Sequence, residues 1–162
     1  MRTTGMRRFR SAAVLGLCFA SAAVCAGERP QFLSSPDPAA AKLPFSEAVR
    51  SGDLLFLSGQ IGTVPGGDNA LASGGIGPEA EQTLRNIRAV LERHGASMRE
   101  VVKCTVFLAD IGDWPEFNEV YRKHFSAPFP ARSALAASGL AMGAKVEVEC
   151  IAQAPRKAGK AQ

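Results

Sequence analysis

Two charged side chains near the C-terminal end of the sequence could form a small-molecule site. Arg132 lies in the segment Phe-Pro-Ala-Arg-Ser (residues 129–133), at the start of a predicted strand and directly after a proline turn. Its guanidinium is a planar fork of N–H donors that suits bidentate binding of a carboxylate. Glu147 follows fifteen residues later in the next predicted strand, so the two side chains could converge at one end of a sheet. A structural ion pair between them is the competing interpretation, and the pattern favours neither.

Other residues with polar or aromatic side chains lack a context that indicates chemistry. Ser58 ends a predicted strand, but it is not in the Gly-x-Ser-x-Gly setting of a hydrolase nucleophile. His94 and His124 lie near the C-terminal ends of predicted helices, where a cation is favoured, and are expected to be structural or surface groups. Trp114 and Tyr121 are expected to anchor their helix rather than to form a platform for a cofactor.

The cysteines do not predict a metal site. Two of the four lie in the apolar N-terminal run, which leaves Cys104 and Cys150 in the body of the chain. No Cys-x-x-Cys motif and no Cys/His cluster is present, so neither zinc nor another metal is expected. Two buried free thiols in strands are the favoured interpretation, because unpaired Cys often behaves as a small hydrophobic residue. A disulfide between them stays open.

The elements that position these residues follow from the hydrophobic pattern. Two strand-like runs joined by Ser-Gly-Asp predict a hairpin, and a glycine-rich segment predicts a loop. Pro78 opens a helix with apolar residues at helical spacing, and Asp113 with Glu116 forms a capping-box pattern at the start of a second helix. The predicted strands are residues 45–50, 54–59, 101–108, 131–138 and 145–153, the last two forming a second hairpin.

This order of elements predicts an α+β fold with both helices on one face of a mixed sheet. A single domain of this size has no second layer for the other face, so we expect a partner subunit to cover it. In the last strand, Val146, Val148 and Cys150 alternate with Glu147 and Glu149. The two carboxylates should therefore point away from the helices.

The apparent basicity of the chain belongs to its ends. The 162 residues carry a net charge of +4, but residues 27–155 hold 12 basic and 15 acidic groups, a net of −3. A basic surface for nucleic acid is therefore not expected. Residues 1–26 combine an arginine-rich start, an apolar run of about 15 residues and small residues before Gly27, which is the pattern of a signal peptide. The run is too short for a membrane-spanning helix.

The chain therefore divides into four segments. Residues 1–26 are a predicted signal peptide, residues 27–42 an irregular arm rich in Pro, Ala and Ser, residues 43–154 a single domain, and residues 155–162 a flexible basic tail. Cleavage of the leader would place the protein in the periplasm or outside the cell, with no membrane attachment.

An ordered set of motifs in the body resembles the Rid family (reactive intermediate deaminases, also called YjgF/YER057c/UK114), over about residues 43–154. The matching segments are residues 57–60 (Leu-Ser-Gly-Gln), 81–87, 101–108, 113–121, 129–133 (Phe-Pro-Ala-Arg-Ser) and 146–152 (Val-Glu-Val-Glu-Cys-Ile-Ala).

The resemblance implies a chorismate-mutase-like fold and a homotrimer with clefts between subunits. It also implies hydrolysis of enamines and imines (2-imino acids) to 2-oxo acids and ammonia, without a cofactor. By position, Arg132 would bind the substrate carboxylate and Glu147 would orient or activate the attacking water. Ser58 and Asn118 would lie near the cleft, and the ring of Phe45 would line it.

This sequence departs from the best-known deaminases at three places. Phe45 stands where those proteins have Tyr, so a hydroxyl is missing, and Ala134 stands where Cys is frequent, although a main-chain carbonyl could suffice there. The turn at residues 125–129 is shorter. These differences leave open a second hypothesis, a trimeric binding module for small carboxylate ligands that performs no turnover. A third, a ribonuclease, is disfavoured by the charge of the body.

Overall fold

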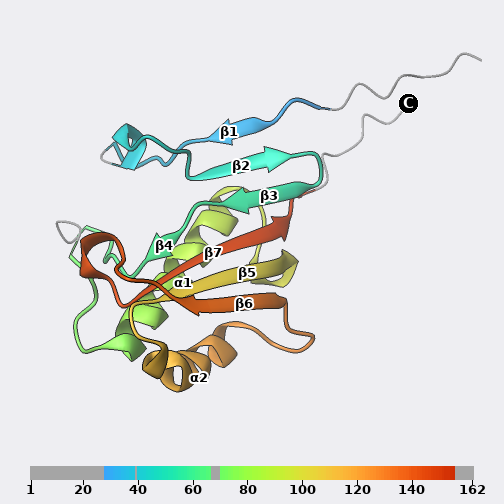
Figure 1. Ribbon diagram of the computed structural model, residues 1–162. Coiled ribbons are helices and arrows are strands. Elements are labelled where there is room, and N and C mark those ends of the chain that lie inside the picture. The colour runs from blue at the N-terminus through green and yellow to red at the C-terminus, as the bar shows by residue number, and fades with distance from the viewer. Residues whose placement is uncertain (1–27, 39, 67–69, 156–162) are drawn as a thin grey trace, which may run out of the picture.

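A computed structural model describes residues 28–38, 40–66 and 70–155, and within these ranges the chain forms a seven-stranded mixed sheet (Figure 1). The strands follow the order β1-β2-β3-β7-β5-β6, and β4 pairs with β7 off this path. The strands are β1 (Gln31–Leu33), β2 (Ala48–Ser51), β3 (Leu54–Leu57), β4 (Gln60–Ile61), β5 (Val101–Leu108), β6 (Ala131–Ala136) and β7 (Val146–Gln153). The predicted α+β class is confirmed.

Two helices, α1 (Ile76–Arg93) and α2 (Trp114–His124), lie on the same face of this sheet (Figure 1). Each helix presents an apolar stripe to the strands, as the periodicity predicts. On α1 the stripe includes Leu84, Ile87 and Leu91, none of them exposed to solvent. In the described part of the chain, no helix is long and apolar enough to cross a membrane.

The first predicted hairpin is confirmed, and its two strands, of four residues each, are shorter than expected. Strands β2 and β3 pair antiparallel from Ala48 opposite Leu57 to Ser51 opposite Leu54, and Gly52 adopts the positive φ of 57° that the tight turn requires. The prediction that residues 27–42 are irregular is wrong for residues 31–33, because β1 pairs antiparallel with β2, Phe32 opposite Val49. Backbone pairing with β2 defines this edge strand, since the side chain of Phe32 remains largely exposed.

The predicted second hairpin does not form. Strand β5 lies between β6 and β7, parallel to β6 and antiparallel to β7. The chain leaves β5, runs through α2 and returns as β6 beside it, which is the crossover that a parallel pair requires. Residues 131–136 and 146–153 are therefore both strands, but they do not pair with each other.

Two helix starts also differ from prediction. Helix α1 begins at Ile76, two residues before Pro78. The capping box at Asp113 does not form, because a short 3₁₀ turn (Ile111–Asp113) already places Asp113 in helical backbone geometry, at φ −75° and ψ −7°. An N-cap side chain needs extended geometry, and Asp110 has it, accepting a hydrogen bond from the amide of Gly112 at 2.8 Å.

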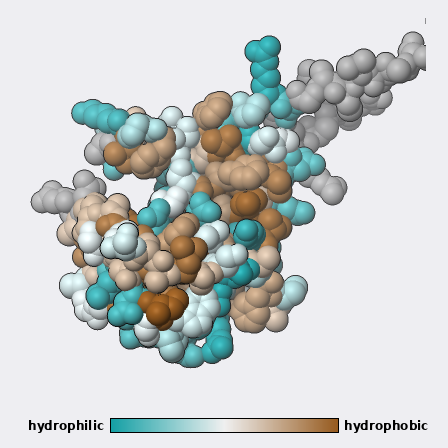
Figure 2. All heavy atoms as spheres, in the orientation of Figure 1, coloured by the Kyte–Doolittle hydropathy of each residue, from teal (hydrophilic) through white to brown (hydrophobic). Residues whose placement is uncertain are grey.

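The sheet face opposite the helices is open. In β7, Val146, Val148 and Cys150 are buried while Glu149 is exposed, so the carboxylates point away from the helices as predicted. Figure 2 views the molecule in the same orientation and shows hydrophobic residues gathered between hydrophilic ones. Phe56 and Leu135 remain 41% and 44% exposed.

Cys104 and Cys150 form a disulfide across β5 and β7. The interpretation favoured above, two free thiols, is therefore wrong, although both residues are buried as expected. The two positions are 46 residues apart in the chain and directly opposite in the sheet, with Cα atoms 4.1 Å apart. Only the register of β5 against β7 brings them together, and no local pattern encodes that register.

Candidate active site

Arg132 lies near the start of the edge strand β6 and points to the helix side of the sheet. Its partner in the parallel register is Cys104, which faces the buried core. Because register partners in neighbouring strands share a face, the side chain of Arg132 extends toward α2. There its Nη2 donates a hydrogen bond of 2.7 Å to Oδ1 of Asn118.

Two aromatic rings of α2 complete this contact. The Cζ atom of Arg132 lies 4.4 Å from the ring centroid of Trp114 and 4.4 Å from that of Tyr121. Trp114, Asn118 and Tyr121 are spaced four and three residues apart, so α2 presents them on one stripe. We call Arg132 with these three residues the arginine cluster. The sequence predicted both rings only as anchors of the helix, although their spacing relative to Asn118 was visible.

The guanidinium of the arginine cluster stays charged although its burial disfavours the charge. Burial lowers the pKa of Arg132 below its ordinary value, and the charge of Arg122 adds to this, yet an arginine side chain stays protonated at physiological pH. Burial raises the pKa of Tyr121 to about 12, so its hydroxyl is neutral. Arg132 makes one side-chain hydrogen bond within the described residues, which leaves most of its five N–H donors for a ligand.

Glu147 lies on β7, and its carboxylate sits directly over Gly59. Its register partners are Ile61 in β4 and Phe107 in β5. A Cβ atom added at Gly59 would lie 2.8 Å from Cδ of Glu147 and would overlap Oε1. The carboxylate therefore occupies the space that the absent side chain of Gly59 leaves open.

The pKa of Glu147 is raised above its ordinary value, first by burial and second by the charge of Glu149. Glu147 is half-buried, and its carboxylate has no hydrogen-bond donor among the described residues. Its proton affinity is therefore increased. A carboxylate with increased proton affinity is a better general base than an ordinary glutamate.

Ser58 shapes the backbone beside Glu147 instead of presenting a free hydroxyl. Its Oγ donates a 2.7 Å hydrogen bond to the carbonyl oxygen of Ser46, and its amide donates to the carbonyl of Glu47 at 3.1 Å. These bonds fix the segment that carries Phe45, whose ring is 56% exposed. We call Glu147 with Ser58, Gly59 and Phe45 the glutamate cluster.

The glutamate and arginine clusters lie on opposite faces of the sheet. Arg132 is on the helix side, with Ala134 two residues further along the same side of β6, whereas Glu147 is on the open side. The expectation that Arg132 and Glu147 converge is therefore wrong for a single chain. The alternative ion pair is also absent, because Arg132 contacts α2 and Glu147 lies over Gly59.

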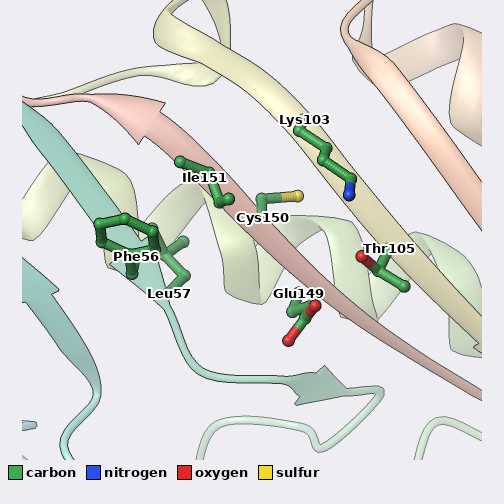
Figure 3. A pocket seen from close by; sticks show the side chains of 7 residues that line it. All are labelled: Phe56, Leu57, Lys103, Thr105, Glu149, Cys150 and Ile151. Atoms are coloured by element: carbon green, nitrogen blue, oxygen red, sulfur yellow. The ribbon is translucent and has the colours of Figure 1, made fainter.

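The open face also holds a small hollow of about 150 Å³ (Figure 3). Its lining comes from three neighbouring strands and includes Phe56, Lys103, Thr105, Glu149 and Ile151. Neither Arg132 nor Glu147 lines this hollow, so it is not the predicted site. Within the described ranges, no three His, Cys, Asp or Glu side chains are grouped closely enough to hold a metal ion.

Comparison with known proteins connects this geometry to a family. The sequence profile described as "Endoribonuclease L-PSP" matches residues 34–154. The chain is 40% identical over 135 residues to Reactive Intermediate Deaminase A of Arabidopsis thaliana, covering 83% of this chain and 72% of that protein. It is 41% identical over 109 residues to the human 2-iminobutanoate/2-iminopropanoate deaminase, covering 67% and 79%. The crystal structure of the yeast protein YEO7 superimposes with a TM-score of 0.71 at 41% identity, covering 78% of this chain and all of that one.

Proposed function

Because the chain belongs to the L-PSP family, which is the Rid group of the resemblance above, we propose that it hydrolyses 2-imino acids to 2-oxo acids and ammonia. The observation that carries this proposal is the arginine cluster. Asn118 and two aromatic rings hold Arg132 with most of its donors unused, which is the arrangement expected of a receptor for a substrate carboxylate. The plant and human relatives named above are deaminases by name.

We further propose that the complete site forms between two subunits of a homotrimer. The arginine cluster of one subunit would meet the glutamate cluster of the next, since the two clusters of one chain face opposite sides of the sheet. The exposed apolar residues of the open face and of β6, among them Phe56 and Leu135, support burial of these surfaces against another copy.

In this site the imine would be hydrolysed by general acid–base chemistry. Arg132 binds the substrate carboxylate and orients the C=N bond, while Glu147 takes a proton from a water as its oxygen bonds to the imine carbon. The C=N double bond becomes a single bond and its electron pair moves to nitrogen, which takes the proton held by Glu147. The hydroxyl proton of the resulting aminoalcohol then moves to the nitrogen, the C–N bond breaks, the C=O bond forms and ammonia leaves. The overall reaction consumes one water and needs no redox partner.

The activity is tested by the release of ammonia from iminopropionate generated with an amino-acid oxidase. We expect the purified protein to accelerate this release, Arg132→Ala to raise KM strongly, and Glu147→Gln to lower kcat. An Arg132→Ala variant as active as the parent would contradict the proposed role of the arginine cluster.

Complementation between these variants tests the site between subunits. Co-expressed Arg132→Ala and Glu147→Gln chains should regain activity, because a mixed trimer contains some interfaces with both native residues, about a quarter of them for random assembly. If each site lay within one chain, the mixture would remain inactive.

We also propose that the protein is exported, with residues 1–26 as a cleaved leader, residues 43–154 as the catalytic domain and residues 155–162 as a solvated tail. The leader and nearly all of the tail lie outside the described residues. Support comes from the three-part composition of the leader and from the buried disulfide, which is typical of an oxidising compartment. Mass spectrometry of the protein from a periplasmic or culture fraction should show an N-terminus near Gly27.

The second candidate function is a trimeric module that binds small carboxylates without turnover. It is favoured by Phe45, which is exposed and lacks the hydroxyl of the corresponding tyrosine. Saturable binding of 2-oxobutyrate or benzoate without imine hydrolysis would support it. Cleavage of RNA is not proposed, because residues 27–155 carry a net charge of −3.

A further inference from the structure

Tyr121 is the least exposed member of the arginine cluster. Its hydroxyl makes no hydrogen bond within the described residues, so hydrogen bonding does not explain why a tyrosine stands at this position. The residue is 3% exposed, and its Oη is buried without a hydrogen-bond partner among the described residues. A buried, unpaired hydroxyl is destabilising. An aromatic ring at this position must therefore contribute through its face and not through its polar atom.

The ring of Tyr121 is itself held rigidly. It stacks on Phe125 with centroids 4.4 Å apart and contacts Phe117 at 5.8 Å. With the guanidinium of Arg132 4.4 Å from its centroid, the ring lies within the range of a cation–π contact. The packed rings of α2 thus support the guanidinium of Arg132, which extends from the edge strand β6.

The hydroxyl of Tyr121 is not placed for proton transfer, because its Oη is buried without a hydrogen-bond partner among the described residues. Burial also raises the pKa of Tyr121 to about 12, so the phenol is uncharged near neutral pH. Its ring instead restricts the guanidinium plane, while Asn118 accepts one N–H at 2.7 Å. A fixed fork loses less entropy when a carboxylate binds than a mobile one does.

We propose that Tyr121 is a positioning residue of the carboxylate site: its ring face fixes the guanidinium of Arg132 for bidentate binding of the substrate. The inference rests on the proposed function, since it assigns how the same site binds its carboxylate. Tyr121 itself does not contact the substrate in this proposal.

The test compares Tyr121→Phe, Tyr121→Leu and the control Val120→Ala in the complete protein. Tyr121→Phe keeps the ring and should bind 2-oxobutyrate with the affinity of the parent. Tyr121→Leu should weaken this affinity about 3- to 20-fold, the range expected for loss of one cation–π contact, and should raise KM with little change in kcat. Val120→Ala removes buried side-chain volume from the same helix without removing a ring of the arginine cluster or a ring that packs on Tyr121, so it should lower stability without changing KM.

A second measurement does not depend on turnover or on ligand binding. In the parent, the Nε–H signal of Arg132, assigned by its loss in Arg132→Lys, should be shifted by the aromatic rings and exchange slowly with water. Tyr121→Phe should preserve the shift, and Tyr121→Leu should reduce it and speed the exchange. An unchanged signal in Tyr121→Leu would overturn the proposal, as would a Val120→Ala variant with an equally weakened affinity. If the parent neither binds 2-oxobutyrate nor hydrolyses imines, the proposed function fails, and the Nε–H signal still decides whether Tyr121 positions Arg132.

Discussion

Replacing Gly59 with alanine should displace the carboxylate of Glu147 while leaving the fold intact. The added Cβ would lie 2.8 Å from Cδ of Glu147 and overlap Oε1. Ordinary contact begins near 3.4 Å, so Cδ must move by at least about 0.6 Å and Oε1 by on the order of 1 Å. The carboxylate is the far end of a flexible side chain, and Gly59 does not have a positive φ, so the backbone need not be strained.

A displacement of this size is large for a group that takes part in proton transfer. Misplacing a reacting group by about 1 Å can reduce a rate by about 100-fold. We therefore expect kcat of Gly59→Ala to fall about 30- to 100-fold in the ammonia-release assay, with little change in the binding of 2-oxobutyrate at Arg132. The thermal unfolding midpoint should remain close to that of the parent.

Gly139→Ala is the matched control. A Cβ at Gly139 meets nothing within 4 Å, and this glycine also lacks a positive φ, so its variant should keep full activity. In the Glu147→Gln background, Gly59→Ala should cause little further loss, because coupled residues do not contribute additively. A Gly59→Ala enzyme with kcat within about threefold of the parent would refute the placement of Glu147 beside the reacting atoms.

Three further predictions follow from charges and covalent links. Glu149→Gln removes the charge that helps to raise the pKa of Glu147, so the acid limb of the kcat/KM profile should move to lower pH, and an unmoved limb would argue against Glu147 as the base. Glu81 has a pKa below its ordinary 4.5, chiefly because of its hydrogen bond with His124. The pair therefore stabilises the fold above the unfolded-state pKa, and this contribution is lost as pH falls through the folded-state pKa. Glu81→Gln should cost about 1 kcal/mol in urea unfolding at pH 7 and nothing at a pH below that transition. Replacing both disulfide cysteines by alanine should lower the free energy of unfolding by roughly 4 kcal/mol, the value for a loop of 46 residues, and a loss below about 1 kcal/mol would indicate that the disulfide is dispensable.

The elements whose signals are local could be predicted from the sequence. Strand β5 runs from Val101 to Leu108, the bounds that its run of β-branched and aromatic residues indicated. The β2–β3 hairpin was specified by a turn sequence between two apolar runs. Strand order is different, because the pairing of β6 with β5 depends on the crossover through α2 and on competition among distant strands. No pattern within residues 131–153 distinguished that outcome from a hairpin.

The same distinction explains which parts of the site were foreseen. In β7, Glu147 and Glu149 alternate with buried residues, so the sequence was sufficient to assign their face. In β6 the sequence Ala-Arg-Ser-Ala-Leu-Ala has no such alternation, and the strand is exposed along nearly its whole length. The face of Arg132 was therefore undetermined until the parallel register with β5 placed it beside α2.

The separation of the two clusters also relates the two candidate functions to each other. The arginine cluster is built from β6 and α2 of one chain, so a single subunit already has the groups that we propose to bind a carboxylate. Acid–base chemistry at the bound ligand needs Glu147, which the same subunit holds on the other side of its sheet. Binding without turnover is therefore the behaviour expected of an isolated subunit, and hydrolysis is the behaviour expected of the assembly. Because the two clusters of one chain lie on opposite faces of the sheet, we expect dissociation of the oligomer to abolish ammonia release. The affinity for a carboxylate should survive the dissociation.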